Sequence, residues 1–423
     1  MVAGITLFIG LVFLTGEHRW DRSGLKDYVE SAEERAIAAG SGNKVRRIAF
    51  FAIGGVGAGL LLIGRRLPAL REPMGLALIL ACGWTYASVA WADSMGFTVK
   101  RLMLLTLCLS GAVGVASAMT LRQIAIALLS VTTFYMMLGV VAEIMQGNFR
   151  PWAGGYRFAG TLHPNAQATN CGAMALGALA LWVRRPGDSP QHRQGMRRCV
   201  GCLFIVAVFF LVLTKSRTAT AAIFLVIGII WATRQQLGLN LILGGTGLLG
   251  ILTLSFVLSV TGVGDSVGEA ANLGRADSQG AFNGRLPIWN ICLRRLGAHM
   301  PVGVGYDGFW TPKRIEDISW ELGWSISSVH SEYIELVLGV GIVGLLLYLL
   351  AQGGSILWFW IRYYRLGHGG DAMILGLLLI GAVQGFMETG YLHPYALVPF
   401  LTLTGMSRLA FFTDRRTAWQ GAI

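Results

Sequence analysis

The chain has 423 residues, of which 54% are hydrophobic and only 13% are charged. Soluble domains average about 25% charged residues, so this composition excludes an ordinary soluble protein and indicates a polytopic membrane protein. The formal net charge is +12, but no basic helix or aromatic-basic module of the kind that binds nucleic acid occurs in a soluble segment. The positive balance fits anionic headgroups or a phosphate-bearing lipid better.

The apolar runs predict eleven or twelve membrane helices. Residues 1–14 are apolar but short for a span of about 20 residues, and without a basic leading region they predict a first helix rather than a cleaved signal peptide. Residues 15–46 are polar. The other predicted spans are 47–63, 74–92, 102–119, 124–144, 165–183, 199–214, 218–233, 237–262, 331–351, 371–390 and 394–412. We therefore predict an all-α helix bundle, with residues 1–423 as a single transmembrane domain and 263–330 as one large loop.

Lys and Arg in the short loops predict the orientation, because cytoplasmic loops carry an excess of both. With both termini inside, the short inner segments hold fifteen of these residues and the short outer loops hold six. Segments 15–46 and 263–330 are left out, since long loops translocate largely regardless of charge. The bias predicts that both long segments face outward, although Arg46 and Arg47 do not fit this pattern.

The segment Tyr156–Asn165 precedes the sixth predicted span and carries two basic side chains, Arg157 and His163. Pro164 and Asn165 suit the start of a helix. The two basic residues are additional candidates for an outer polar site. An equally good interpretation is that they are structural residues of the loop.

Thr214–Thr218 lies at the predicted outer end of a helix and contains Lys215 and Arg217. A guanidinium presents a planar fork that matches paired phosphate oxygens and stays charged at any working pH. Arg217 is therefore a candidate phosphate ligand, and the alternative is an arginine that extends to the membrane interface. For Lys215 the two interpretations are about equal.

The loop 263–330 is long for a membrane connector, and long loops are usually functional or disordered. Asn283 is a possible helix cap and Pro287 fits a first helical turn. Apolar residues then recur at helical spacing at Ile288, Ile291, Cys292 and Leu296. They predict an amphipathic helix that lies on the membrane or on the bundle, with Arg294 and Arg295 as a solvated or headgroup-facing pair.

Within this loop, Arg285 is the arginine that we select as the second candidate phosphate ligand, for the same reason of guanidinium geometry. The glycine-rich segment Pro301-Val-Gly303-Val-Gly305 follows the predicted helix. On its own it predicts only a turn, because a phosphate loop would need a following helix.

Val329–Gly344 joins the loop to the next apolar run. Ser331 is a plausible N-cap, and Glu332 falls in the first turn, where a carboxylate suits the helix dipole. His330, Gly341 and Gly344 are predicted to share one stripe of the helix. The glycines would let another membrane helix pack closely and fix the direction of the histidine. The alternative is an interfacial histidine beside a helix cap, with glycines that serve packing alone.

Charged and titratable residues gather at the predicted outer helix ends rather than at mid-membrane. They are Glu143, Arg157, His163, Lys215, Arg217, Glu335, Glu388 and His393. A charge at the bilayer centre costs about 2.5–3.5 kcal/mol on insertion scales, a cost that transporters accept at their substrate sites. The pattern favours a site at the outer leaflet over a transport pathway, with Glu335 as a further candidate site residue.

Other chemistries have little support. The histidines are scattered, and Cys199 and Cys202 form a CxxC without a second ligand pair at zinc spacing, so we predict no metal and no cofactor. No Walker loop or dinucleotide motif occurs. Ser331 adjoins His330, but neighbours on a helix do not face each other, so no protease-like set is indicated.

The spacing of His330, Ser331, Gly341 and Gly344 resembles that of the O-antigen ligase family, which shares a fold with polymerases of O-antigen and exopolysaccharide. The resemblance in layout covers residues 47–412. Its specific motifs lie in four segments: 157–165 (Gly-Thr, then Pro-Asn), 214–218 (Ser-Arg), 283–309 (Gly-Arg, then Pro-x-Gly-x-Gly) and 330–344.

The resemblance implies a metal-independent, inverting glycosyltransferase similar to the GT-C membrane type, in a bacterial cytoplasmic membrane with its site facing the periplasm. Such a protein moves a glycan from polyprenyl pyrophosphate to a sugar hydroxyl. His330 would act as general base. Arg217 and Arg285 would hold the pyrophosphate. The partners implied are the lipid-linked donor, a saccharide acceptor and membrane lipids, with no nucleic acid.

Three hypotheses follow. A polymerase would use another lipid-linked repeat unit as acceptor, and we favour it slightly. A ligase would use lipid A core or a protein. A transporter or flippase is the alternative from another class, and a charged groove at mid-membrane would favour it.

Overall fold

The computed structural model describes residues 1–18, 31–41, 44–65, 67–182, 190–235, 285–390 and 393–413. Each apolar run predicted inside these ranges is helical, and these ranges contain no strand. The helices are α1 (Val2–Glu17), α2 (Ala32–Ser41), α3 (Lys44–Gly64), α4 (Pro73–Ala87), α5 (Met95–Ala118), α6 (Leu121–Met145), α7 (Pro164–Trp182), α8 (Pro190–Leu213), α9 (Arg217–Arg234), α12 (Arg285–Leu296), α13 (Pro312–Leu322), α14 (Glu332–Leu366), α15 (Gly369–Gln384) and α16 (Leu397–Ser407). The predicted span 237–262 and the predicted cap Asn283 lie outside the described residues.

In the described part of the chain, seven helices are long and apolar enough to cross a membrane: α3, α4 with the 3₁₀ turn that follows it, α5, α6, α8, α9 and α14. Three shorter apolar helices are α1, α15, and α16 with the π turn Arg408–Phe412. The predicted class, an all-α polytopic membrane bundle, is confirmed. The predicted number of eleven or twelve spans stays a prediction.

Helix α14 is longer than its predicted span of 331–351. The helix continues through Gln352–Ser355 to Leu366. Ser355 Oγ donates to the Ala351 carbonyl at 2.7 Å, and the side chain of Gln352 is buried, so both polar side chains are accommodated within the helix. Conversely, α15 ends at Gln384 instead of residue 390, which leaves 385–390 as a turn.

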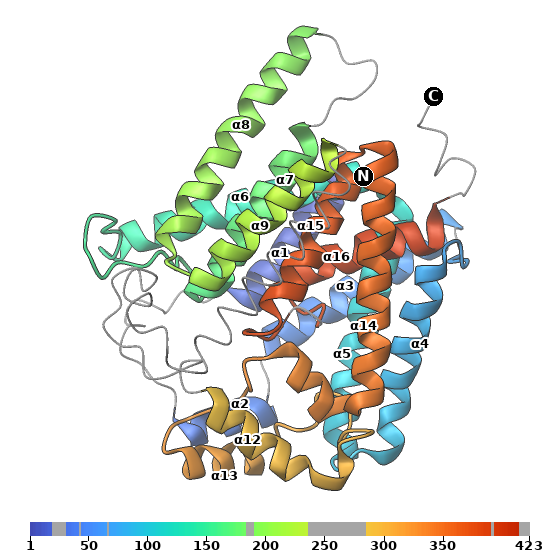
Figure 1. Ribbon diagram of the computed structural model, residues 1–423, viewed down its shortest axis with the longest axis vertical. Coiled ribbons are helices and arrows are strands. Elements are labelled where there is room, and N and C mark those ends of the chain that lie inside the picture. Colours follow the sequence, from blue (N-terminus) through green and yellow to red (C-terminus); the bar gives the residue numbers. More distant parts are fainter. Residues whose placement is uncertain are drawn as a thin grey trace.

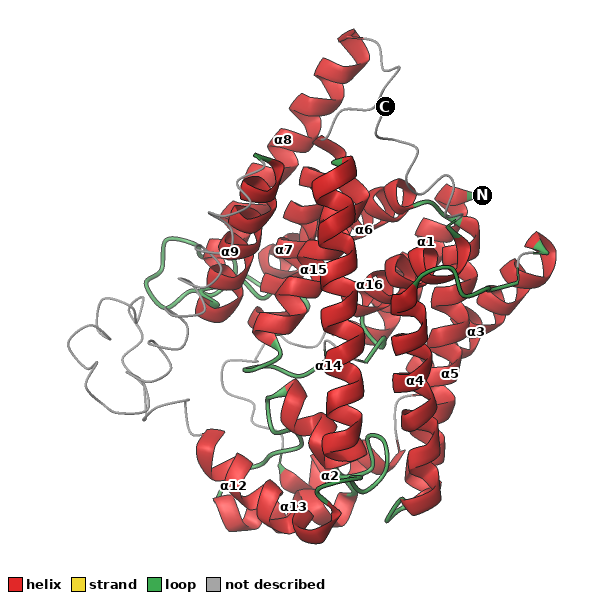
Figure 2. Ribbon diagram, turned by 45° about the vertical axis from the view of Figure 1, so that its right-hand side comes forward, coloured by secondary structure: helices red, strands yellow, loops and turns green. Residues whose placement is uncertain are grey.

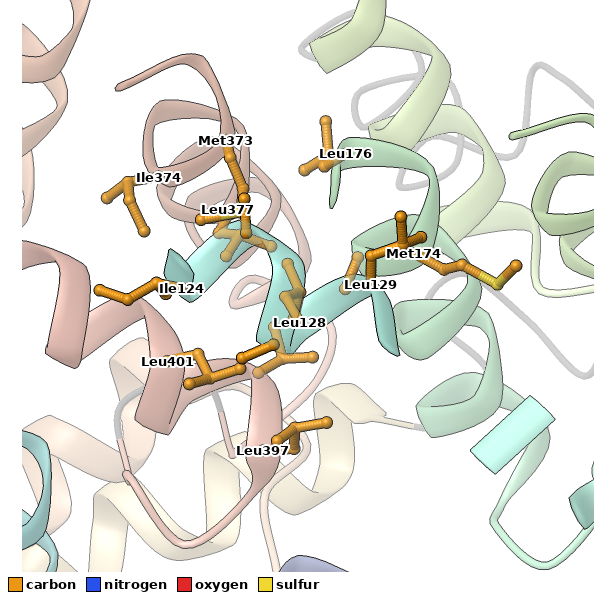
Figure 3. Packing of buried hydrophobic residues seen from close by; sticks show 14 of the residues in the cluster. Ile124, Leu128, Leu129, Met174, Leu176, Met373, Ile374, Leu377, Leu397 and Leu401 are labelled. Carbon is orange, nitrogen blue, oxygen red and sulfur yellow. The ribbon is translucent and has the colours of Figure 1, made fainter. Parts of the chain in front are cut away.

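The core of the bundle is formed by α6, α7, α15 and α16, whose aliphatic side chains interdigitate (Figure 3). Leu128 of α6, Ile374 of α15 and Leu401 of α16 are fully buried. Because lipid tails are as apolar as these side chains, the contacts stabilise the bundle chiefly through close van der Waals packing. These helices form a fixed frame for the segments at their ends.

A second, smaller core lies at one end of the molecule, where α2, α12 and α13 lie together (Figures 1 and 2). The four apolar residues predicted for the amphipathic loop helix are all buried, as expected for one apolar face. They pack against Ala36 of α2, Ile315 of α13 and Leu338 of α14. The helix therefore lies on other protein elements, including the bundle helix α14.

The predicted glycine stripe on α14 is wrong, because the helix breaks at Gly341. This residue has φ 73° and ψ −176°, a conformation that only glycine adopts readily. A Cβ atom there would lie 2.2 Å from the carbonyl oxygen of Pro301. The close partner of Gly341 is thus the Pro301–Gly305 segment of the loop, whereas a Cβ atom at Gly344 would lie 3.1 Å from Trp84 of the membrane helix α4.

Backbone hydrogen bonds join this loop segment to the break. The amide of Ile342 donates to the Met300 carbonyl at 3.0 Å, and the amide of Val304 donates to the Leu338 carbonyl at 3.0 Å. Polar backbone groups that a break frees inside a membrane protein must find such partners. The loop that carries α12 is therefore attached directly to the helix that follows His330.

The packing of α2 against α13 predicts that both polar segments lie on the same side of the membrane. We expect cysteines at Glu33 of α2 and at Trp320 of α13, which is 89% exposed, to react together or be protected together. The measurement is labelling of intact cells with a membrane-impermeant maleimide, after the exposed Cys199 and Cys202 are changed to serine. One reactive and one protected position would contradict the packing.

Candidate active site

The turn 385–390 meets the first residues of α14. The amide of Glu332 donates to the Gly385 carbonyl at 2.8 Å, and the amide of Gly390 donates to Glu332 Oε2 at 2.5 Å. Ser331 is the N-cap residue as predicted, although its side chain makes no capping hydrogen bond. The start of α14 is thus held by the turn that follows α15.

His330 directly precedes this helix start. It is half-buried and has φ 52°, which is unfavourable for a side chain with a Cβ atom. Its amide donates to Ser328 Oγ at 3.1 Å, and Ser328 Oγ lies 3.1 Å from Thr389 Oγ1 of the turn. Strained residues of this kind persist only where their surroundings hold them, and they gather at functional sites.

Glu335, one of the additional candidates, supports the same loop from within α14. Its carboxylate accepts hydrogen bonds from the Val329 amide at 2.9 Å and from Trp310 Nε1 at 3.0 and 2.9 Å. These contacts fix the residue directly before His330. The geometry gives Glu335 a positioning part, because its oxygens are engaged with the protein.

Arg285 is the first residue of α12, and its guanidinium reaches the turn 385–390. Nη1 donates to the Met387 carbonyl, and Nη2 lies 3.2 Å from Glu388 Oε1. The same carboxylate oxygen accepts from Asn165 Nδ2 at 2.7 Å. Burial raises the pKa of Glu388, and the neighbouring Arg285 charge opposes that rise. The loop arginine and the start of α7 are therefore joined through one carboxylate.

Arg157 extends this network towards Arg217. Its Nη2 donates to Asn165 Oδ1 at 3.4 Å, and its Nε donates to the Thr214 carbonyl at 3.0 Å. Thr214 lies three residues before Arg217, which is half-buried and begins α9. A chain of hydrogen bonds thus connects the segment of Arg217 to Arg285.

The other two additional candidates lie at the edge of this network. The side chain of Lys215 points to the loop before α7, where Nζ donates to the Gly154 carbonyl. His163 is exposed, and its Nδ1 accepts from the Asn165 amide at 3.3 Å. Lys215 is thus turned towards the surface loop, whereas His163 lies next to the network.

The loop that carries Arg157 is held by Glu143 at the end of α6. Glu143 Oε2 accepts from the Tyr156 hydroxyl at 2.5 Å, and Oε1 accepts from the amides of Ala159 and Gly160 at 3.0 and 2.8 Å. A buried carboxylate with three donors is well compensated. These hydrogen bonds to Glu143 fix the loop that carries Arg157.

The pKa of His330 is lowered to about 4 by burial, followed by the charges of Arg285 and Arg35 and by His163. The ring is therefore neutral at physiological pH, with a lone pair available to accept a proton. Arg35 comes from α2, so the N-terminal polar segment contributes to the electrostatics of the site.

Glu332, at the helix start, also forms an ion pair with the half-buried His393. His393 Nδ1 is 3.4 Å from Glu332 Oε1, and the ring stacks on Tyr395 with centroids 5.4 Å apart. Burial alone would lower the pKa of His393, but the hydrogen bond and charge of Glu332 raise it to about 9. His393 is therefore protonated at neutral pH, and its contact with Glu332 holds the segment after the turn 385–390 against α14.

Arg294 and Arg295 form surface contacts, as predicted for a solvated pair. Arg294 Nη2 lies 3.2 Å from Glu321 Oε1, and its side chain is 66% exposed. Arg295 Nη2 lies 2.7 Å from Glu321 Oε2. This contrasts with Arg285 on the same helix, whose side chain is 17% exposed.

Glu388 and Arg35 are among the residues of this site that sequence reasoning did not select as candidates. Glu388 stood in the polar band at the outer helix ends, and this was a usable signal. Arg35 carried no such signal, because its place depends on the packing of α2 against α13. Among the described residues, no group of three or more His, Cys, Asp or Glu side chains could hold a metal ion.

These features define a membrane-embedded helical protein with a cationic site at one end of its bundle, built around a neutral histidine. Residues 202–349 match the Wzy_C family model, described as O-Antigen ligase. The matched segment contains α9, α12, α13, Arg217, Arg285 and His330. The resemblance seen in the sequence is thereby confirmed for this segment, which is similar to the O-antigen ligase family. No curated protein matches the chain.

The low pKa of His330 predicts an unusual pH profile for the reaction proposed below. We expect kcat/KM, which reports the free enzyme, to stay flat from pH 8 to about 5.5 rather than fall near 6.5. Arg35→Gln removes one of the charges that lower the pKa of His330. The acidic limb of the kcat/KM profile of this variant should therefore move to higher pH. Arg294→Ala is the matched control and should leave the limb unchanged. If the acidic limb of the wild-type profile were centred near the ordinary histidine pKa of about 6.5, it would contradict the lowered pKa of His330.

The Glu332–His393 pair predicts a loss of stability in alkali. Because the pKa of His393 is about 9 in the folded protein and its ordinary value is 6.5, its stabilisation is complete below the lower value and is lost as pH rises through the higher one. We expect thermal unfolding in detergent to show a larger fall in Tm between pH 7.5 and 9.5 for wild type than for His393→Asn. The surface variant His299→Asn should behave like wild type, and equal falls in all three would refute the role.

Proposed function

We propose that this protein transfers a glycan from polyprenyl pyrophosphate to a sugar hydroxyl at the periplasmic face of a bacterial cytoplasmic membrane. The observation that supports the proposal most directly is the network that links the segments of Arg217 and Arg285 next to the neutral His330. Guanidinium groups suit a pyrophosphate, because each offers several N–H donors in one plane.

In the proposed reaction, the acceptor hydroxyl oxygen attacks the anomeric carbon of the donor sugar. The bond between that carbon and the pyrophosphate oxygen breaks, and the leaving group takes the electron pair. The proton of the hydroxyl passes to the His330 ring, a role worth about 10²–10⁴ in rate. Arg217 and Arg285 stabilise the charge that develops on the pyrophosphate. In-line displacement inverts the anomeric centre, and the arginines serve in place of a metal ion.

Two acceptors are compatible with this donor chemistry. A lipid-linked repeat unit as acceptor makes the protein a polymerase of O-antigen or exopolysaccharide. Attachment to lipid A core makes it a ligase of lipopolysaccharide biosynthesis, and the match to the family model is compatible with both reactions. The two are distinguished by product, because a polymerase extends the glycan ladder and a ligase moves an existing glycan onto the core.

The alternative of a transporter or flippase is less well supported. Both proposed arginines begin helices at one end of the bundle, and the buried pair Arg362–Asp371 lies at the opposite end of α14. Neither arrangement provides charged ligands for a substrate at mid-membrane.

Substitutions at His330 and along α12 test the proposal. His330→Ala should insert normally yet abolish most product, because the base is lost. Arg285→Lys should also fail, since an ammonium keeps the charge but loses the paired geometry. Arg294→Ala removes an exposed arginine of the same helix and should cost little. The measurement is the glycan ladder and the core-linked product in cells that lack the native gene, with protein amounts compared by blot.

A normal product pattern from His330→Ala would disprove the general-base role. If Arg294→Ala were as damaging as Arg285→Lys, α12 would act only as a basic surface, and Arg285 would have no special place.

A further inference from the structure

The turn 385–390 contacts several of the elements that the proposed reaction needs. It binds the start of α14 through Glu332, the loop of His330 through Thr389, and α12 through Met387 and Glu388. It is a short segment between α15 and α16, and it contributes none of the residues assigned to base or pyrophosphate binding. Its contacts therefore require another explanation.

Glu388 is the central residue of the turn. One carboxylate oxygen, Oε1, lies 3.2 Å from Arg285 Nη2 and 2.7 Å from Asn165 Nδ2. Asn165 in turn accepts from Arg157, which donates to the Thr214 carbonyl in the segment before Arg217. Removal of this carboxylate would disconnect the two halves of the network.

Arg285 keeps donors for a ligand while Glu388 holds it. A guanidinium has five N–H groups, and in the described part of the chain Arg285 uses two nitrogens, Nη1 towards Met387 and Nη2 towards Glu388. Its Nε and the second hydrogens of both Nη atoms remain in the same fixed plane. Glu388 thus orients the Arg285 guanidinium and leaves some of its N–H donors for a ligand.

We propose that Glu388, supported by the turn 385–390, is a positioning residue that fixes the spacing and orientation of Arg285 relative to Arg217 and thereby sets the affinity for the pyrophosphate of the donor. This inference rests on the proposed function. Glu388 acts through Arg285 and Asn165 and does not touch the reacting atoms. Its loss should therefore affect donor binding more than the chemical step.

Three variants test the inference with purified protein and a lipid-linked donor. A lost hydrogen bond to a charged group corresponds to roughly a 10–100-fold change in affinity, so Glu388→Ala should raise the donor KM by about this factor while kcat changes much less. Glu388→Gln keeps an acceptor oxygen for Asn165 and Arg285 and should recover most of the loss. Glu321→Ala is the matched control, because Glu321 pairs with Arg294 and Arg295 on the exposed face of the same helix.

A binding measurement separates this inference from the proposed function. Polyprenyl pyrophosphate alone should raise the Tm of wild type and Glu321→Ala, and it should have a much smaller effect on Glu388→Ala. If wild type neither transfers glycan nor responds to the lipid, the proposed function fails. If wild type does both and Glu388→Ala keeps the same KM and the same Tm response, the function stands and the positioning role is overturned.

Two further outcomes decide the remaining cases. If Glu388→Ala does not fold, Glu388→Gln carries the test, and a donor KM within a few-fold of wild type supports the inference because one neutral acceptor still orients the arginine. If both variants lose kcat equally with an unchanged donor KM, Glu388 takes part in the chemical step, and the positioning role is overturned.

Discussion

The break of α14 at Gly341 is the constraint on which the site depends. With φ 73° at this residue, the helix axis is interrupted, and the Pro301–Gly305 segment enters the space that a side chain would fill. Backbone hydrogen bonds from Val304 and Ile342 then close the gap. Because α12 lies directly before this segment, the attachment brings Arg285 to the end of the bundle where His330 precedes α14. A larger residue at 341 would separate the loop from the helix, and with it the proposed phosphate ligand from the proposed base.

Three carboxylates at this end of the protein each contact two partners rather than one. Glu388 serves Arg285 and Asn165, Glu335 serves Trp310 and the loop of His330, and Glu332 serves the turn 385–390 and His393. A buried carboxylate is costly unless it is paired and hydrogen-bonded. Each of these carboxylates contacts at least one segment that is distant from it in sequence, so the same contacts that offset desolvation also assemble the site.

The sequence predicted the helices well, because a long apolar run is a local signal and lipid demands internally satisfied backbone. Local rules also found Pro164 and Ser331 at helix starts. The predicted role of Gly341 was wrong, because its conformation depends on Pro301, some forty residues away in the chain and outside any periodic pattern. Arg35 and Glu388 were not selected for the same reason, since their contacts are set by tertiary packing. Candidate residues could thus be predicted by type and position, whereas their partners could not.

The electrostatics of His330 suggest how the proposed base could be coupled to the donor. Burial and the charges of Arg285 and Arg35 hold its pKa at about 4, so in the donor-free protein it is neutral but a weak base. A pyrophosphate bound between the arginines brings negative charge close to the ring, which favours the protonated form and raises the pKa. The arginines then depress the basicity of His330 only while no anion is bound. Binding of the donor therefore strengthens the base at the moment when the acceptor hydroxyl must lose its proton, and the acidic limb of kcat should lie at a higher pH than that of kcat/KM.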